Sequence, residues 1–598
     1  MPASKRTLAT SMLALALLAG TATSFAQEGT ERKPVVFNVG DAAGIDSMNP
    51  LVGVTVPAYE AWNIQYATVT DKSPKDFSPI PGLAESWKGS PDGKTWTYTM
   101  RANQKWSDGQ PLTAEDVAYT INRAKKEEWL NYTSVVANLT AKAESPTTLV
   151  VRSSVVDPKL PTLDMYVLPK HIWEKQDAKA ITKYAALDGV GSGPFVLEKF
   201  ERGQFARFKA NPNYYGGKPA VDRVVLRDFD NPDAMVAALK RGEIDAAEDV
   251  PGTAFHQLEK DPNIVTVQGN QGAMNEFAIN GGDGLKKPHP ALLDLKVRQA
   301  IAHAIDKKTI VDRVLAGLGT PTDTLSVSPN ADWSPKIPDG QRFDFDLDKA
   351  KQILEDAGYK DTNGDGIREM PGGGRALKFR YAVRSEGVTA PATAELITGW
   401  LRQIGIATTQ KTYNDSQLTE VIGKGDYDLF AWGWTPYVDP DPMLSYFTCD
   451  QVSQDPEDPT NYYNDANWCD PQYDALYKQQ KVERDKAKRM DIVHQMLTRF
   501  YESATYNVLY VYPDLQAYRK NRFTGWTRQP ANTGPVLFSN SSPTYAKLKP
   551  FVASASTGKA DDGGGGSAGL IAIIVVAVVV LGGGGLWAMR RRTADERE

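Results

Sequence analysis

The acidic stretch from Asp361 to Glu369, DTNGDGIRE, has the residue types and part of the spacing of a calcium-binding loop. Asp361, Asn363 and Asp365 fall at ligand positions 1, 3 and 5, and a glycine follows at position 6. Position 12 of such a loop carries a glutamate that binds calcium with both oxygens, and here it is Gly372. The calcium pattern is therefore incomplete, and we predict neither a metal site nor a cofactor.

The other residue types that can carry out reactions do not assemble into a known catalytic motif. The five histidines are scattered, with no H-E-x-x-H and no close metal-binding pair. Ser192, in GVGSGPF, is not in a nucleophile elbow, because Val190 and Pro194 stand at the two positions where G-x-S-x-G requires glycine. No G-x-x-x-x-G-K-[ST] phosphate loop occurs, so ATP chemistry belongs to a partner. We predict that the protein is not an enzyme.

Composition favours binding of an organic solute over binding of nucleic acid. The 598 residues carry a formal net charge of −5, whereas nucleic-acid binders present a basic face. Thirteen Trp and 25 Tyr offer flat aromatic surfaces for a ligand, although most such rings pack in a core.

The N-terminus has the three parts of a secretory signal peptide. Lys5 and Arg6 precede an apolar stretch, and Ser24-Phe25-Ala26 fits a small-x-small cleavage site. We predict cleavage after Ala26; the alternative is an uncleaved anchor.

The C-terminus has the pattern of a membrane anchor. Residues 569–589 carry no charge and are long enough to cross about 30 Å of hydrocarbon as a helix. Three arginines follow, which predicts a cytoplasmic end. We therefore predict a single-pass protein of the cell membrane with its N-terminal ectodomain outside. The glycine-rich segment before the span predicts a flexible linker.

The two cysteines are Cys449 and Cys469. An exported chain favours oxidation, and a bridge between them would stabilise the fold by roughly 3 kcal/mol. We predict a disulfide; two free thiols are the alternative.

Hydrophobic periodicity predicts helices that alternate with strands, an α/β pattern. Asn231 and Pro232 begin a helix that ends near Gly242, and a short strand follows. Residues 346–358 and 394–404 have amphipathic helical spacing. Thr113, with Asp116 three residues later, predicts a capping box.

Several longer stretches, in this order, resemble one family. They include PGLAESWKGSPDGKTWTYTMRANQKWSDGQPLTAEDVAYTINRA, VLPKHIWEK, GSGPFVLEKFERG, NPNYYGGKPAVDRVVLRDF, LDLKVRQAIAHAIDKKTIVDRVL and GYKDTNGDGIREM. Together they resemble the family 5 extracellular solute-binding proteins, the dipeptide- and oligopeptide-binding group of ABC importers. The resemblance covers residues 36–545.

The resemblance implies an α/β fold of two hinged lobes, of the periplasmic-binding-protein type, that closes over its ligand. An extra domain is inserted in lobe one. The expected segments are a signal peptide 1–26, lobe one 27–58, 190–274 and 506–551, the extra domain 59–189, lobe two 275–505, a linker 552–568, a transmembrane helix 569–589 and a tail 590–598.

In dipeptide-binding relatives an arginine before the 394–404 helix grips the ligand carboxylate, and Arg384 matches its position without a gap. A guanidinium suits a carboxylate, since it makes charge-assisted hydrogen bonds. The alternative is a surface arginine or an ion pair with Glu386.

Peptide-binding relatives also carry an aspartate after a Gly-Trp pair, which receives the ligand's amino group. Here Gly433-Trp434 is followed by Thr-Pro-Tyr, so the expected acid is missing. Asp439 could replace it, although it also fits Asp-Pro turn chemistry. Trp432, Trp434 and Tyr437 are expected to line the cleft, with core packing as the alternative.

Further contacts are expected from the resemblance at Asn275 and Phe277, where the chain crosses between lobes. Gly53 and Thr55 near the N-terminus, and the turn with Ser192 and Pro194, are others. Turn-forming and core roles are the alternatives.

We therefore predict a membrane-tethered binding protein, a monomer, that captures short peptides and delivers them to an ABC permease with ATPase subunits. The alternatives are a non-peptide solute (an oligosaccharide, an opine-like compound or a metal chelate) and, from another class, an ectodomain sensor of a ligand.

Overall fold

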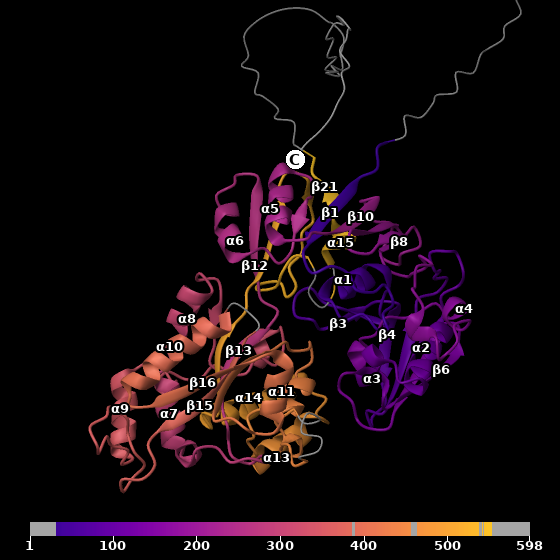
Figure 1. Cartoon of the computed structure of the whole chain (residues 1–598). Coiled ribbons are helices and arrows are strands. Elements are labelled where there is room, and N and C mark those ends of the chain that lie inside the picture. Colours follow the sequence, from indigo (N-terminus) through magenta and orange to yellow (C-terminus); the bar gives the residue numbers. More distant parts are fainter. Residues whose placement is uncertain (1–31, 386–388, 456–462, 538–540, 542, 553–598) are drawn as a thin grey trace, which may run out of the picture. The chain divides into compact units, whose positions relative to one another are not determined.

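The computed structural model describes residues 32–385, 389–455, 463–537, 541 and 543–552. These residues form two α/β lobes, each built on its own mixed sheet, and a smaller antiparallel sheet that the chain enters from the first lobe (Figure 1). The predicted signal peptide and the span 569–589 lie outside the described residues.

The first lobe is built on a seven-stranded sheet whose strands come from separate stretches of the chain. Across the sheet they are β12 (Ile264–Gly269), β19 (Asp514–Arg519), β11 (Ala246–Ala247), β1 (Val36–Asp41), β10 (Arg223–Asp228), β9 (Phe205–Ala210) and β8 (Phe195–Glu201). Strand β1 is parallel to both β10 and β11. The carboxyl ends of these three strands therefore lie at one edge, where α1 (Val56–Gln65) follows β1 in the chain.

Helix α5 (Pro232–Arg241) confirms the helix predicted after Asn231. The Asn231 side chain accepts a hydrogen bond from the Ala234 backbone N–H at 2.8 Å, which satisfies an otherwise free donor. Gly242 ends the helix with φ of 78°, a left-handed conformation that glycine adopts without steric cost. Helix α5 and α6 (Gly252–Leu258) pack their apolar side chains in one small core.

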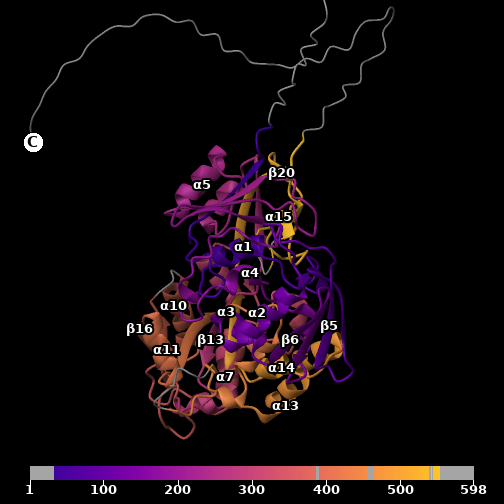
Figure 2. The same cartoon turned by 90° about the vertical axis from the view of Figure 1, so that its right-hand side faces the viewer.

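The segment between α1 and β8, which we call the inserted domain, has a four-stranded antiparallel sheet with α2 (Ala114–Lys126) packed against it (Figure 2). Its strands are β4 (Ala84–Gly89), β5 (Thr95–Met100), β7 (Thr148–Ser153) and β6 (Leu139–Ser145). The predicted capping box at the start of α2 is confirmed, since Asp116 accepts a hydrogen bond from the Thr113 N–H at 2.9 Å and the Thr113 side chain caps the helix in return. The short helix α3 (Leu130–Val136) follows.

The second lobe is built on a six-stranded mixed sheet. Its order is β14 (Thr320–Pro321), β18 (Tyr506–Val511), β13 (Met274–Ile279), β17 (Leu429–Trp434), β15 (Lys378–Arg384) and β16 (Ala407–Tyr413). Strand β15 is parallel to β16 and to β17, so the ends of β15 and β17 at Arg384 and Trp434 point the same way along the sheet.

Helices cover both faces of this sheet (Figure 1). One core holds side chains of α7 (Leu295–His303), α8 (Lys307–Val314), α9 (Leu347–Asp356) and α10 (Thr389–Gln403). The other holds side chains of α11 (Asp415–Gly423), α12 (Asp441–Ser445), α13 (Pro471–Gln480) and α14 (Lys486–Glu502). Alternate residues of β13 enter the two cores, Phe277 the first and Met274 the second, as the period of a strand requires.

The chain passes between the two large sheets twice. The first passage joins β12 to β13 through residues 270–273, and the second joins β18 to β19 through residues 512–513. Strand β18 belongs to the sheet of the second lobe although it begins at Tyr506, where we expected the chain to re-enter lobe one. The domain boundaries drawn from the sequence stay predictions.

Cys449 and Cys469 form the predicted disulfide, with their Cα atoms 4.5 Å apart. It joins the chain after α12 to the start of α13, on the side of the sheet that carries Trp434. Among the residues that the structure describes, no helix has both the length and the apolarity to cross a membrane.

We predict that replacing both cysteines by serine lowers the free energy of unfolding by about 3 kcal/mol, because the bridge closes a 20-residue separation and so restricts the unfolded chain. Urea unfolding of the oxidised protein and of the double variant measures the difference. Equal midpoints would contradict the prediction, and reduced wild-type protein, which should match the variant, is the control.

Candidate functional site

Arg384 lies at the last position of β15, with its guanidinium held by an acidic partner. Its Nε donates to Asp415 Oδ1 at 2.5 Å, and a second N–H donates to the other carboxylate oxygen. Its guanidinium carbon is also 5.3 Å from the ring centroid of Trp432. Arg384 therefore forms an ion pair within the protein, which was the alternative to a ligand role, but its partner is Asp415. Glu386, the partner named in that alternative, lies outside the described residues. A ligand carboxylate at Arg384 would have to share the guanidinium with Asp415.

Trp432 and Trp434 at the end of β17 are half-buried, and both pack on the core that α11 to α14 cover. The Trp434 indole N–H lies 2.8 Å from the Tyr506 hydroxyl and 3.1 Å from Asp465 Oδ2. The Trp434 ring lies 5.0 Å from that of Tyr446, which stacks on Tyr463 at 4.9 Å. These rings form a row that begins in the core and ends at the exposed Tyr463.

Asp439 is committed to a partner inside the protein. Its two carboxylate oxygens accept hydrogen bonds from Arg489 at 2.7 and 2.8 Å. Arg489 is 5% exposed, so its charge needs that carboxylate. Asp439 thus pairs with a side chain of α14 in this structure. Its contacts do not support the predicted role of binding a ligand amino group.

A cavity of about 580 Å³ opens beside Tyr437, and we call it the Tyr437 cavity. One wall comes from the second lobe, with Tyr437, Asp439 and Tyr446 after β17 and Trp333 from another loop. The opposite wall comes from the inserted domain, with Val135 of α3 and the loop 157–164. The volume is that of a small-molecule pocket. It brings together two of the predicted residues, Tyr437 and Asp439.

The two walls of the Tyr437 cavity are joined by polar contacts. Lys159 of the inserted domain lies 3.2 Å from Asp441 at the start of α12. The Asp76 backbone carbonyl accepts a hydrogen bond from the Asn330 side chain at 3.3 Å, and the Asp76 carboxylate lies 3.7 Å from Lys486.

The remaining predicted contacts have structural roles. The Asn275 amide donates to the Trp432 carbonyl, and the Phe277 ring is fully buried 5.5 Å from that of Tyr381. The Thr55 hydroxyl donates to Asp46 at 2.8 Å at the start of α1. The Gly53 carbonyl accepts from Asn131 at 2.9 Å, and a Cβ there would lie 2.6 Å from the Trp62 ring. Their ligand roles stay predictions.

The turn at Ser192 and Pro194 is also built into the fold. The Ser192 hydroxyl is buried and accepts a hydrogen bond from the Ala67 N–H at 2.9 Å. The Pro194 carbonyl accepts one from the Asn211 N–H, also at 2.9 Å.

The structure also contains buried carboxyl groups that we did not predict. Glu276 on β13 is fully buried, and neither of its oxygens has a hydrogen-bond partner among the described residues. Burial and the nearby Asp465 raise its pKa well above the usual range, and burial raises the pKa of Asp465 to about 7. The one signal in the sequence was an acid at an inward position of a strand whose other residues, except Asn275, are apolar.

A second acidic group lies at the carboxyl edge of the first lobe's sheet. Asp41 ends β1, Glu248 follows β11, and Glu60 of α1 accepts a hydrogen bond from the Tyr545 hydroxyl. Burial raises the pKa of Glu60 to about 7, and burial together with the charge of Glu60 raises the pKa of Glu248 well above its usual range. Burial also raises the pKa of Asp514, at the start of β19, to about 7.

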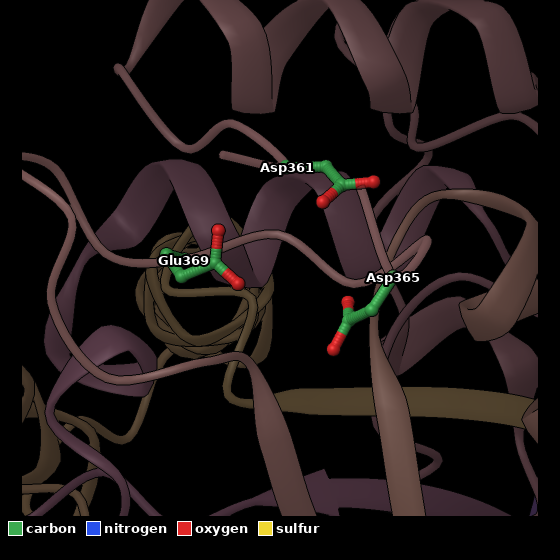
Figure 3. Close-up of side chains that lie close together, drawn as sticks. All are labelled: Asp361, Asp365 and Glu369. Atoms are coloured by element: carbon green, nitrogen blue, oxygen red, sulfur yellow. The ribbon is translucent and has the colours of Figure 1, made fainter. Parts of the chain in front are cut away.

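The calcium-like loop is closed by its own carboxylates (Figure 3). One oxygen each of Asp361, Asp365 and Glu369 lie within 4.8 Å of one another. Asp361 accepts hydrogen bonds from the Gly364 and Gly366 N–H groups at 2.7 and 2.9 Å. Glu369 accepts from the Thr362 hydroxyl at 2.8 Å. These carboxylates hold the turn together.

Comparison with known proteins places the chain among binding proteins. Residues 78–455 match the sequence profile described as bacterial extracellular solute-binding proteins, family 5 Middle. The oligopeptide-binding protein AppA of Bacillus subtilis is 27% identical over 507 residues, which cover 83% of this chain and 89% of that protein. The nickel-binding periplasmic protein of Escherichia coli is 26% identical over 450 residues, which cover 72% and 80%. The solved structure of Bacillus subtilis AppA with a nonapeptide matches with a TM-score of 0.64 at 24% identity, covering 87% of this chain and 100% of that one.

These findings correct the predicted location. We predicted a single-pass protein of the cell membrane, but no helix among the residues that the structure describes could cross a bilayer. The matching family and the Escherichia coli relative are described as extracellular and periplasmic. The prediction of a membrane protein is therefore wrong.

We predict that stability falls as the pH rises from about 4 to 7, partly because of Asp465. Its pKa is raised to about 7 in the folded protein, so the fold holds a proton that the unfolded chain releases, and unfolding becomes easier as that proton becomes less available. Asp465→Asn copies the protonated form and should flatten the fall by about 2–4 kcal/mol. Urea unfolding at several pH values measures this. The exposed Asp312→Asn is the control, and an unchanged slope in Asp465→Asn would contradict the prediction.

Proposed function

This chain belongs to the bacterial extracellular solute-binding proteins of family 5, and from that premise we propose that it captures short peptides between its lobes for an ABC importer. Proteins of this family are binding proteins and not enzymes. The observation that carries the proposal is the Tyr437 cavity, whose walls come from the second lobe and the inserted domain. A ligand there touches both walls at once. The match to an oligopeptide-binding protein over 89% of its length supports a peptide as that ligand.

Ligand contact with both walls gives a physical reason for closure. A ligand shifts an equilibrium only by the difference between its affinities for the two states, and a closed form offers it two walls instead of one. The passages at 270–273 and 512–513 are the hinge in this proposal. The closed form then docks, as a monomer, on a permease whose ATPase subunits drive uptake.

One observation favours a second candidate ligand. Asp439 is occupied by Arg489, so the acid after Gly433-Trp434 is not available to a peptide amino group. A nickel-binding relative matches over 80% of its length. A non-peptide solute, such as a metal chelate, is therefore the alternative.

We predict that short peptides change the intrinsic fluorescence and raise the melting temperature of the purified protein, because Trp333 lines the Tyr437 cavity and Trp434 packs on its lining residue Tyr446. Isothermal titration with di- to pentapeptides should give saturable binding. A nickel–histidine complex and an oligosaccharide are the parallel probes. Binding of either probe without binding of any peptide would favour the alternative ligand.

We further predict that Asp415→Asn strengthens the binding of peptides with a free C-terminus by about threefold to tenfold, because Arg384 then loses its charged competitor. The same peptides with an amidated C-terminus should gain little. Arg384→Met should remove the difference between free and amidated peptides. The same affinity ratio in all three proteins would show that Arg384 does not bind the carboxylate.

A further inference from the structure

The structure assigns the Tyr437 cavity a specific preference: it accepts an uncharged, apolar side chain of the ligand, aromatic or large aliphatic, and rejects charged ones. This inference rests on the proposed capture of peptides and adds which side chains are selected.

Apolar side chains line the cavity on both sides. Tyr437, 55% exposed, and the half-buried Tyr446 come from the second lobe. The inserted domain contributes Val135, Leu160 and Leu163 opposite them. Two aromatic rings facing aliphatic groups offer dispersion contacts and a π-face to a guest ring.

The charged residues of the lining already have partners within the protein. Asp439 is bound by Arg489, Lys159 by Asp441, Asp164 by Lys72 at 2.6 Å and Asp76 by Lys486. The other three charged residues form hydrogen bonds with the backbone. Asp157 accepts one from the Lys159 N–H at 2.9 Å, and Glu483 accepts one from the Asp485 N–H at 2.7 Å. Arg484 donates one to the Pro91 carbonyl at 2.9 Å.

These existing partners explain why the cavity favours apolar over charged side chains of the ligand. A charged side chain that enters loses water, and it must then compete with an existing ion pair or with a backbone hydrogen bond for a counter-charge. An apolar side chain loses no favourable hydration and gains contact with the walls. The cavity of about 580 Å³ is large enough for one aromatic side chain with part of its backbone.

The preference can be measured with alanine tripeptides that carry phenylalanine, leucine, lysine or glutamate at one of the three positions. At one position, phenylalanine and leucine should bind about 10- to 100-fold more tightly than alanine, given the area that each buries. Lysine and glutamate should bind no better than alanine at that position. Titration calorimetry gives the dissociation constants.

A cycle of variants locates the effect in the cavity. Tyr437→Ala should reduce the advantage of phenylalanine over alanine by about threefold to tenfold, since aromatic pairs contribute beyond their buried area. Tyr437→Phe should keep it. Phe345→Ala, which removes another exposed ring of the second lobe, is the matched control and should change nothing. Val135→Asp should raise the affinity for the lysine tripeptide relative to the phenylalanine one.

Each outcome decides the inference. Equal affinity for alanine, phenylalanine and lysine at all positions overturns the subsite while peptide capture stands. An advantage of phenylalanine that Tyr437→Ala leaves unchanged places apolar selection elsewhere and overturns the assignment to this cavity. If no tripeptide binds, peptide capture and the subsite both fail. Melting curves confirm that every variant is folded.

Discussion

The ion pair between Arg489 and Asp439 holds one wall of the Tyr437 cavity in place. Arg489 extends from α14 with 5% of its surface exposed, stacks over the Trp333 ring at 5.4 Å, and donates to Gln480 at 3.1 Å. Gln480 in turn donates to Asp441, which meets Lys159 of the inserted domain. A guanidinium that has left water requires such partners, so the loop after β17 is drawn toward α14 and Tyr437 is left facing the cavity. The same requirement explains why Asp439 is not available for a ligand.

Other buried carboxyl groups of the protein are stabilised in a different way. Asp465 accepts a hydrogen bond from the Trp434 indole and lies close to Glu276, and Glu60 and Glu248 lie at the carboxyl edge of the first sheet. In both places burial and like charge favour the protonated acid. Carboxyl groups kept neutral in this way cost less to bury than carboxylates. The charged side chains around the Tyr437 cavity are thus stabilised by polar partners, whereas the buried carboxyl groups of the two sheets are stabilised by protonation.

The sequence predicted what local chemistry determines. Asn231 and Gly242 mark the ends of α5, Thr113 and Asp116 cap α2, and the two cysteines form one bridge, because each of these features depends on neighbours in the chain or on a simple count. Short matching stretches along the chain were enough to identify the family.

The partners of the site residues could not be predicted in the same way. Arg384 meets Asp415 and Asp439 meets Arg489 across separations of 31 and 50 residues, and those meetings follow from how strands and helices pack. The cavity was missed for the same reason, since Val135 and Tyr437 face each other only in the folded chain. The membrane location was predicted from an apolar tail that lies outside the described residues, whereas the matching family is described as extracellular.

The two short passages between the large sheets limit how the lobes can move. A body attached at a single point can swing and twist in every direction, whereas attachment at two points leaves rotation about the line through them as the easy motion. With four residues in one passage and two in the other, stretching is negligible. In the proposed closure of the lobes, opening and closing would therefore follow nearly one rotation, and the protein would lose little conformational entropy on returning to the closed form.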